Sequence, residues 1–487
     1  MWQCPKLLWL SKFRPELRAV DTALEERFKT GNEVGDLAMG LFGEFTEVTA
    51  YKEDGSLDLD RMQQMTMECI ANGVENICEA SFNHNGLYCA VDILRKENDG
   101  YAIYEVKSST DASYIYAVDI TYQKYVLEKC GVNITGTYLV CIDSSYIRGK
   151  ELDIKKLFKT IDMSADVTEE LPRVPHLLKK AEDIYQMTDE PVCDLGPNCR
   201  DPYNCAFWDH CTQHLPNPNV FNLYRISFKN ALKHYYGGNI SYRELFYSGC
   251  ISNDKQTRQI LHYLTPQADE IDKDGIRAFL STLSYPIYFL DFETIQPVIP
   301  LYEGTKPYAQ IPFQYSLHYI EYEGGPLMHK EFLAESGADP RRAIAESLCK
   351  DIPENVCVTA YNKAFECTRL KELAAYFPDL AEHLLDIEHN IKDLLLPFQG
   401  GYYYNKAMGG SFSIKSVLPA LFPDDPELDY HNLDQIHNGG EAMTIFPKIK
   451  DMSAEDQARA RKNLLEYCKL DTYAMVKVWE KLREASR

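Results

Sequence analysis

Residues 285–298 read YPIYFLDFETIQPV, an apolar run that carries two acids near its end. In a strand, residues two apart share a face, so Asp291 and Glu293 point the same way, in line with Ile287. The residues between them are apolar too, which predicts a central strand buried on both faces. The acids stand at its carboxyl end, where open α/β sheets place their ligands. Because burying unpaired charge costs several kcal/mol, a divalent metal ion is the simplest way to stabilise both acids there.

Two later segments add acids and a tyrosine on suitable elements. AYNKAFECTRLKELA places Glu366 at the start of a helix, directly after the strand NVCVTAYN. EYCKLDTYAMVKVW places Tyr467 and Asp471 four residues apart, on one face of a late helix. Taken alone, each short motif is more often a helix-capping acid or a chance pair on a solvated helix. Three of them in this order, each on its expected element, favour a shared metal site.

The three motifs together resemble those of the DEDDy branch of the DnaQ-like, ribonuclease H-fold exonucleases. The resemblance implies a hydrolysis in which two Mg²⁺ or Mn²⁺ ions clamp the scissile phosphate. It implies four metal ligands, namely Asp291, Glu293, Glu366 and Asp471. Tyr467 is then expected to position the attacking water. The family usually has aspartate where Glu366 stands, so the exact metal geometry stays open. MGGSFSIKSVLPALFP resembles the helix entry between the second and third motifs, and its Ser411 and Lys415 are expected to contact substrate.

The first half of the chain carries a second set of acids. GLYCAVDILRKENDGYAIYEVKSST predicts two strands joined by a KENDG turn, with Asp92 on the first and Glu105 and Lys107 on the second. On their own, such alternating charges are more typical of an exposed strand. The pattern resembles the core of the PD-(D/E)XK nucleases, in which the acids hold a metal and the lysine stabilises developing charge. The helix AVDITYQKYVLEKCG carries Gln123, which resembles a glutamine of RecB-like members. GNEVGDLAMGLF resembles their first helix, where Glu33 is expected in place of the usual histidine.

Cysteines are concentrated in PNCRDPYNCAFWDHC, which holds Cys199, Cys205 and Cys211 at equal spacing. Cys193 lies one equal step earlier, and Cys4 lies in WQCPKLLWL. Thiolates this dense in a loop need a metal or a cluster to organise them, and either Cys193 or Cys4 can complete a set of four. The set with Cys4 resembles RecB-like nucleases with a 4Fe-4S cluster, such as the AddB-type repair nucleases and the CRISPR-adaptation nucleases, and leaves Cys193 spare. A structural zinc ion is the main alternative, although this spacing is looser than in ordinary zinc knuckles.

The whole chain of 487 residues has a net charge of −22 and the 45% hydrophobic content of a globular protein. It has no apolar run long enough to span a membrane and no secretion signal, so we expect it in the cytoplasm. The negative charge restricts nucleic-acid contacts to local patches or metal ions. A candidate for such a patch follows the cysteines, where basic residues alternate with tyrosine and phenylalanine as in a single-strand platform, although a bridging helix with a solvated basic face is the more common reason for this composition. These basic residues are Arg225, Lys229, Lys233 and Arg243.

These observations predict an α/β protein of three parts. They are a restriction-endonuclease-like domain (1–215), a helical connector (216–284) and a ribonuclease H-like 3′ to 5′ exonuclease domain (285–487). The arrangement resembles an uncharacterised bacterial fusion family. The expected function is metal-dependent hydrolysis of DNA or RNA in processing, repair or defence, with single-stranded or end-containing DNA as the partner. Two alternatives stay open: a binding module with one or both nuclease sites inactive, and a redox-sensing iron-sulfur protein.

Overall fold

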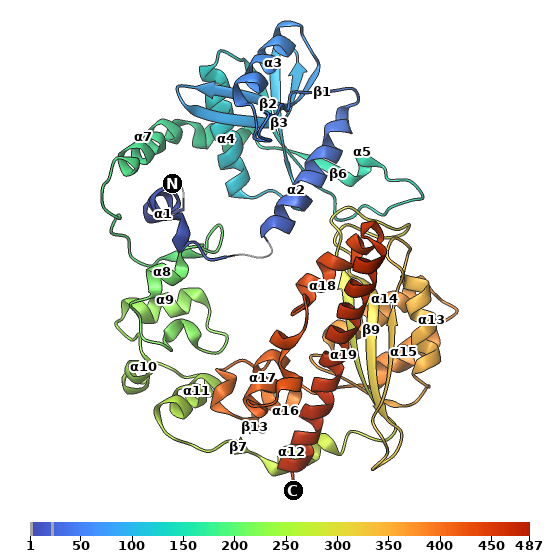
Figure 1. Ribbon diagram of the computed structural model, residues 1–487. Helices are drawn as coiled ribbons and strands as arrows, with labels where there is room; N and C mark the ends of the chain where they lie inside the picture. Colours follow the sequence, from blue (N-terminus) through green and yellow to red (C-terminus); the bar gives the residue numbers. More distant parts are fainter. Residues whose placement is uncertain (1–2, 21–23) are drawn as a thin grey trace. The chain divides into compact units, whose positions relative to one another are not determined.

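The computed structural model describes residues 3–20 and 24–487, and its contacts divide the chain into two compact units (Figure 1). The first unit comprises the described residues up to Gln213 together with Pro297–Ala309, and the second comprises His214–Gln296 together with Gln310–Arg487. Each unit has its own sheet with helices on both faces, so the expected α/β class is confirmed. None of the helices in the described residues is both long and apolar enough to cross a bilayer.

The first unit is built on a six-stranded sheet: β1 (Thr46–Glu47), β2 (Asn76–His84), β3 (Leu87–Glu97), β4 (Gly100–Lys107), β5 (Ile134–Ile142) and β6 (Phe158–Asp162). Its helices are α1 (Pro5–Phe13), α2 (Leu24–Ala38), α3 (Leu59–Ala71), α4 (Tyr114–Lys129), α5 (Ile154–Leu157), α6 (Ser164–Glu170), α7 (Val174–Tyr185) and α8 (Trp208–Thr212). The strands follow one another in sequence order, and the predicted hairpin is β3 and β4. α3, α4 and α6 cover one face of the sheet, and α2 covers the other.

Residues 297–309 complete the second of these faces. Val298, Ile299 and Tyr308 pack against the same apolar cluster as α2. Arg148 fixes the segment, because its backbone N–H donates to Thr305 O over 3.0 Å and its guanidinium donates to Pro300 O over 2.7 Å. The first unit is therefore made of two separate stretches of the chain.

The second unit is built on a five-stranded sheet in the order β10 (Met328–Leu333), β9 (Ile311–Ile320), β8 (Ile287–Ile295), β11 (Cys357–Ala360) and β12 (Ile391–Asp393). A short pair is formed by β7 (Glu270–Ile271) and β13 (Tyr403–Tyr404). The helices before the sheet are α9 (Phe228–Tyr236), α10 (Tyr242–Ser248), α11 (Asp254–Leu264) and α12 (Lys273–Leu280). Those within and after it are α13 (Arg341–Asp351), α14 (Ala364–Tyr376), α15 (Ala381–Asn390), α16 (Leu396–Gln399), α17 (Ile414–Leu421), α18 (Gly439–Ile445) and α19 (Ala454–Ala485).

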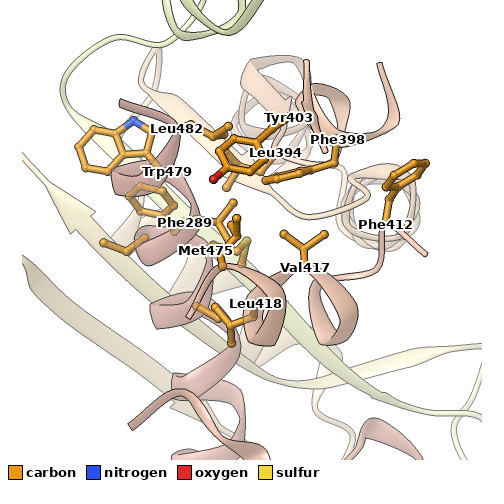
Figure 2. Packing of buried hydrophobic residues seen from close by; sticks show 14 of the residues in the cluster. Phe289, Leu394, Phe398, Tyr403, Phe412, Val417, Leu418, Met475, Trp479 and Leu482 are labelled. Carbon is orange, nitrogen blue, oxygen red and sulfur yellow. The ribbon is translucent and has the colours of Figure 1, made fainter. Parts of the chain in front are cut away.

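The strand β8 occupies the centre of this sheet and is buried on both faces, as predicted. On one face Phe289 packs with Val417 of α17 and with Met475 and Trp479 of α19, and its ring centre lies 5.7 Å from that of Trp479 (Figure 2). On the opposite face the strand packs against α13, α14 and α15. Burial of this kind stabilises by about 1.5–3 kcal/mol for each large apolar side chain.

Polar contacts fix the position of the long helix α19 along the sheet. The Gln314 side chain of β9 donates to Leu464 O over 2.7 Å. Eight residues later, the Thr472 hydroxyl lies 2.7 Å from Ser316 Oγ and 2.8 Å from His318 Nδ1. All of these side chains are buried. A shift of the helix by one turn would therefore leave several buried polar groups without hydrogen-bond partners. The sheet thereby sets where the side chains of α19 lie.

Replacing Phe289 by alanine is expected to destabilise the second unit by about 3–5 kcal/mol, because the ring is fully buried and its removal leaves a cavity beside Trp479. Hydrogen exchange of the β8 and β9 amides measures this change within the second unit itself. The matched control is Tyr322→Ala, whose ring is 60% exposed and whose loss should cost no more than about 0.5 kcal/mol. Equal protection in both variants would contradict the packing described for β8.

Candidate metal centres

Three of the predicted acids meet at the carboxyl end of β8. Asp291 and Glu293 come from the strand and Asp471 from α19, and each offers an oxygen within 4.8 Å of the other two. In the part of the chain that the structure describes, this is the only group of three or more His, Cys, Asp or Glu side chains that lie so close. Carboxylate oxygens at this spacing are the ligands that Mg²⁺ and Mn²⁺ prefer.

The fourth predicted acid, Glu366, lies beside this group rather than within it. It stands in the first turn of α14, directly after β11, as the sequence predicted. Its side chain is buried, and Oε2 has no hydrogen-bond partner. Its charge nevertheless acts on Asp291, whose pKa it helps to raise. A buried carboxylate oxygen without a partner is costly, and a cation at this position would satisfy it.

Burial and mutual repulsion dominate the electrostatics of these acids. Burial, followed by the charges of its acidic neighbours, raises the pKa of Asp291 well above its usual range. Burial likewise raises the pKa of Glu293 and of Glu366 to about 8. The pKa of Asp471 rises only to about 6, because nearby hydroxyl groups and one lysine oppose the effect of burial. Full ionisation of the cluster therefore needs added positive charge.

The groups that favour ionised Asp471 are two tyrosines and Lys415. The Tyr430 hydroxyl donates to Asp471 Oδ1 over 2.6 Å, and the predicted Tyr467 also bonds to this carboxylate. Lys415 Nζ lies 5.4 Å from the centre of the Tyr430 ring and 5.7 Å from that of Tyr467. The structure thus brings Tyr467 to the acids as predicted, and adds Lys415, which the sequence analysis expected only to contact substrate, and Tyr430, which it missed.

In the first unit, the structure joins four of the five predicted residues. Asp92 Oδ2 accepts from the backbone N–H of Val106 over 2.6 Å. Glu105 accepts from Gln123 Nε2 over 2.7 Å and pairs with Lys107 over 2.8 Å. Burial, with the charge of Glu105 next, raises the pKa of Asp92 well above its usual range. Burial lowers the pKa of Lys107, but the nearby carboxylates outweigh it and leave this pKa raised.

The fifth predicted residue, Glu33, lies elsewhere on α2, where its exposed side chain pairs with Lys29 over 3.7 Å. A different acid, Glu79 of β2, faces Glu105 instead. Burial, with the charge of Glu105 next, raises the pKa of Glu79 to about 7. Its φ of 58° is unusual for a residue other than glycine and typical of functional sites. The sequence carried a signal for Glu79, since it is an acid inside the apolar strand NICEASF.

The clustered cysteines are all free thiols, and they gather from both ends of the first unit. Cys4 Sγ lies 3.6 Å from Cys193 Sγ, so Cys193 is a close neighbour of the predicted set. Cys4 acts electrostatically on each of the others, namely Cys193, Cys199, Cys205 and Cys211. Burial raises the pKa of Cys193 and of Cys211 to about 11. Thiols in this state bind a metal only if the metal displaces their protons.

Mn²⁺ is expected to raise the melting temperature of the second unit, more at pH 8 than at pH 6, because the ion competes with protons for the acids. Without metal, the folded state binds more protons than the unfolded chain, since the pKa of Glu293 rises from 4.5 to about 8. Metal-free stability should therefore fall as pH rises through that window. Calorimetry with and without Mn²⁺ measures both effects, and an ion at 100 times its Kd adds about 2.7 kcal/mol.

Asp291→Asn is the decisive variant for this measurement. It removes one of the crowded charges, so it should stabilise the metal-free protein and abolish the response to Mn²⁺. Glu455→Gln changes an exposed acid in the first turn of α19 and should keep the full response. A response to Mn²⁺ that survives in Asp291→Asn would place the ion elsewhere.

Comparison with known proteins adds relatives but no described activity. A family model described as "Domain of unknown function (DUF2779)" matches residues 288–413, which span β8 to the residue before α17. "Uncharacterized protein MG366 homolog" of Mycoplasma pneumoniae is 24% identical over 207 residues, which are 39% of this chain and 31% of the relative. "Uncharacterized protein UU173" of Ureaplasma parvum is 26% identical over 234 residues, 43% of this chain and 33% of the relative. The chain thus spans about a third of the length of these curated relatives. No solved structure matches it significantly.

Proposed function

We propose that this chain is a metal-dependent nuclease whose second unit is a ribonuclease H-like, DEDDy-type 3′ to 5′ exonuclease. This proposal rests mainly on the group of Asp291, Glu293 and Asp471, of which the last two are buried and Asp291 is half-buried, with the unpartnered oxygen of Glu366 beside it. Acids this close together destabilise the folded protein unless a cation neutralises them. Such destabilising arrangements are typical of functional sites. The position of the group at the carboxyl end of a central strand supports a ligand site.

The residues present fit a two-metal site. Mg²⁺ or Mn²⁺ bound there would supply an activated water and neutralise charge on the leaving oxygen. The protein side chains fix the orientation of the acids and set their protonation. Tyr467 and Tyr430 hold the Asp471 carboxylate from one side, and their hydroxyls keep it ionised. Lys415, whose charge acts on Glu293 and Asp471, stands where it can attract a phosphate oxygen.

For the first unit, we propose a RecB-like PD-(D/E)XK nuclease site. The supporting contacts are the fixed orientation of Asp92 by the Val106 N–H and the pairing of Glu105 with both Lys107 and Gln123. Glu79 adds a third acid to this site. We propose nucleic acid in the cytoplasm, single-stranded or end-containing DNA first, as the substrate. The alternative is a binding module, which the glutamate at position 366 keeps open.

The cysteine group fits an iron-sulfur cluster better than a zinc ion. A tetrahedral zinc ion, with Zn–S bonds of about 2.3 Å, holds its four sulfurs about 3.8 Å apart. Cys4 and Cys193 have that spacing, at 3.6 Å. However, no three of the cysteine sulfurs, all of which are described, lie within 4.8 Å of one another. We therefore propose a 4Fe-4S cluster held by Cys4, Cys199, Cys205 and Cys211, and the electrostatic effect of Cys4 on the other three thiols supports this set.

Degradation of end-labelled single strands of DNA and RNA with Mn²⁺ tests the two nuclease sites. Asp291→Asn and Lys107→Ala are each expected to reduce a different activity by about 100-fold or more. The double variant should lose both activities. Lys350→Gln, an exposed change on α13, is the control and should cut normally. If the wild-type protein binds the strands and cuts none of them, the binding-module alternative replaces the proposal.

Metal analysis of anaerobically purified protein tests the cluster. Iron is expected in the wild type and in Cys193→Ser, and it should be lost from Cys199→Ser and Cys4→Ser, because a cluster needs all four thiolates. Cys250→Ser, a change at an exposed thiol in the second unit, should retain iron. Zinc in place of iron, or loss of metal only in Cys193→Ser, would contradict the predicted set.

A further inference from the structure

A pocket of about 640 Å³ lies in the second unit, and the proposed chemistry uses only one of its lining residues, Lys415. Residues 222–225, 361–362 and 409–415 line most of it, and we call it the Ser411 pocket. It includes both residues that the sequence analysis expected to contact substrate, Ser411 and Lys415. Of the four basic residues predicted as a platform, only Arg225 is among its lining residues.

Two cations stand at this pocket without a counter-charge. Arg225 lines it, and Lys255 lies 5.4 Å from the ring centre of Tyr224 and 5.8 Å from that of Phe412, both lining residues. Within the described residues, neither cation has a carboxylate within 4 Å. Burial, with the charge of Arg225 next, lowers the pKa of Lys255, so the two cations repel each other. In a chain with a net charge of −22, such an unneutralised pair indicates an anionic ligand.

The backbone of Arg225 is held in an unusual conformation. Its φ is 47°, in the left-handed region that residues other than glycine rarely adopt. Strain of this kind persists only where the surrounding structure enforces it, and it is common in ligand clamps. Here the surroundings are α11, because Gln256 donates to Tyr224 O over 2.8 Å and Gln259 donates to Asn222 O over 2.9 Å.

The same helix joins the two sides of the Ser411 pocket. Gln259, which is buried, also donates to Gly409 O over 2.9 Å. A Cβ at Gly410 would come within 2.6 Å of the Gln259 side chain, so this approach requires glycine. Phe412, which also lines the pocket, packs into the apolar core that Figure 2 shows. The pocket is therefore a preformed part of the fold.

The start of α17 supplies further anion-binding groups. Ser413 is the N-cap of this helix, yet its side chain makes no capping hydrogen bond. Ser413 Oγ lies 3.3 Å from Ser411 Oγ and 3.1 Å from Ser416 Oγ, so three hydroxyl groups gather at the start of this helix. Amides in a first helical turn favour phosphate oxygens. Lys415, in the same turn, links the pocket to the acids, since its charge acts on Glu293 and Asp471.

We infer that the Ser411 pocket binds the sugar-phosphate backbone of a single nucleic-acid strand and leads its end to the metal centre, an inference that rests on the proposed function. Arg225 and Lys255 pair with phosphates of the bound strand. A duplex, whose major groove alone is about 12 Å wide, does not fit a pocket of this volume. The ligand is thus a single strand.

The test is binding of a fluorescein-labelled oligothymidylate to the full chain carrying Asp291→Asn, followed by anisotropy in EDTA over a range of salt concentrations. The double variant Arg225→Gln/Lys255→Gln should weaken binding about 10-fold or more. It should also reduce the slope of log K against log salt by about 1.4, or 0.7 for each lost phosphate contact. Arg225→Lys/Lys255→Arg retains both charges and should bind nearly as the parent does, which separates loss of charge from misfolding.

The matched control is Lys273→Gln/Lys350→Gln, which removes the same charge from exposed positions on α12 and α13 and should leave affinity within about twofold. Equal loss in both double variants, or none in the first, would overturn the inference. Equal affinity for a blunt duplex and for the single strand would also overturn it. The same holds if the Arg225 and Lys255 changes weaken binding of thymidine monophosphate but not of the strand. A different outcome separates the two proposals. If strand binding depends on Arg225 and Lys255 but the protein with the native Asp291 hydrolyses no strand, the binding inference stands and the nuclease proposal is refuted.

Discussion

Repulsion among the buried carboxylates at the end of β8 is the constraint on which the second unit is organised. Asp291 and Glu293 are delivered by the central strand, and Asp471 is delivered by α19, whose position the Gln314 and Thr472 contacts fix. The apolar packing around Phe289 stabilises the unit against this repulsion. Tyr430 and Tyr467 reduce it at Asp471, and Lys415 reduces it at Asp471 and Glu293, yet the pKa of both acids stays raised, so full ionisation depends on a cation.

The two candidate sites meet the same problem in different ways. In the first unit Lys107 lies 2.8 Å from Glu105, so a positive charge is built into the site and part of the repulsion is neutralised by the chain itself. In the second unit no lysine or arginine of the described chain lies within 4 Å of Asp291, Glu293 or Asp471. The second site should therefore respond more strongly to added metal than the first, and its acids should be the harder ones to ionise without it.

Much of the fold around β8 could be predicted, because the signals are local. An apolar run with two acids indicates a buried strand, and helix periodicity places Tyr467 and Asp471 on one face. Tyr430 could not be predicted, since it lies in a 3-10 helix of only three residues and approaches Asp471 only through tertiary packing. Glu79, like Asp291, is an acid inside an apolar strand. The sequence does not show which other acid lies opposite Glu79. Whether Cys193 lies beside Cys4 depends likewise on how distant segments meet.

The course of the chain after β8 bears on how this protein can be divided. Residues 297–309 follow the strand that carries Asp291 and Glu293, yet they complete the apolar face beside α2. A gene fragment ending near residue 213 would lack Val298, Ile299 and Tyr308 and would leave that face open to water. A fragment beginning near residue 285 would carry the same side chains with nothing to cover them. Neither cut yields a fragment whose apolar surface is fully covered, so the two units should be produced together as one chain.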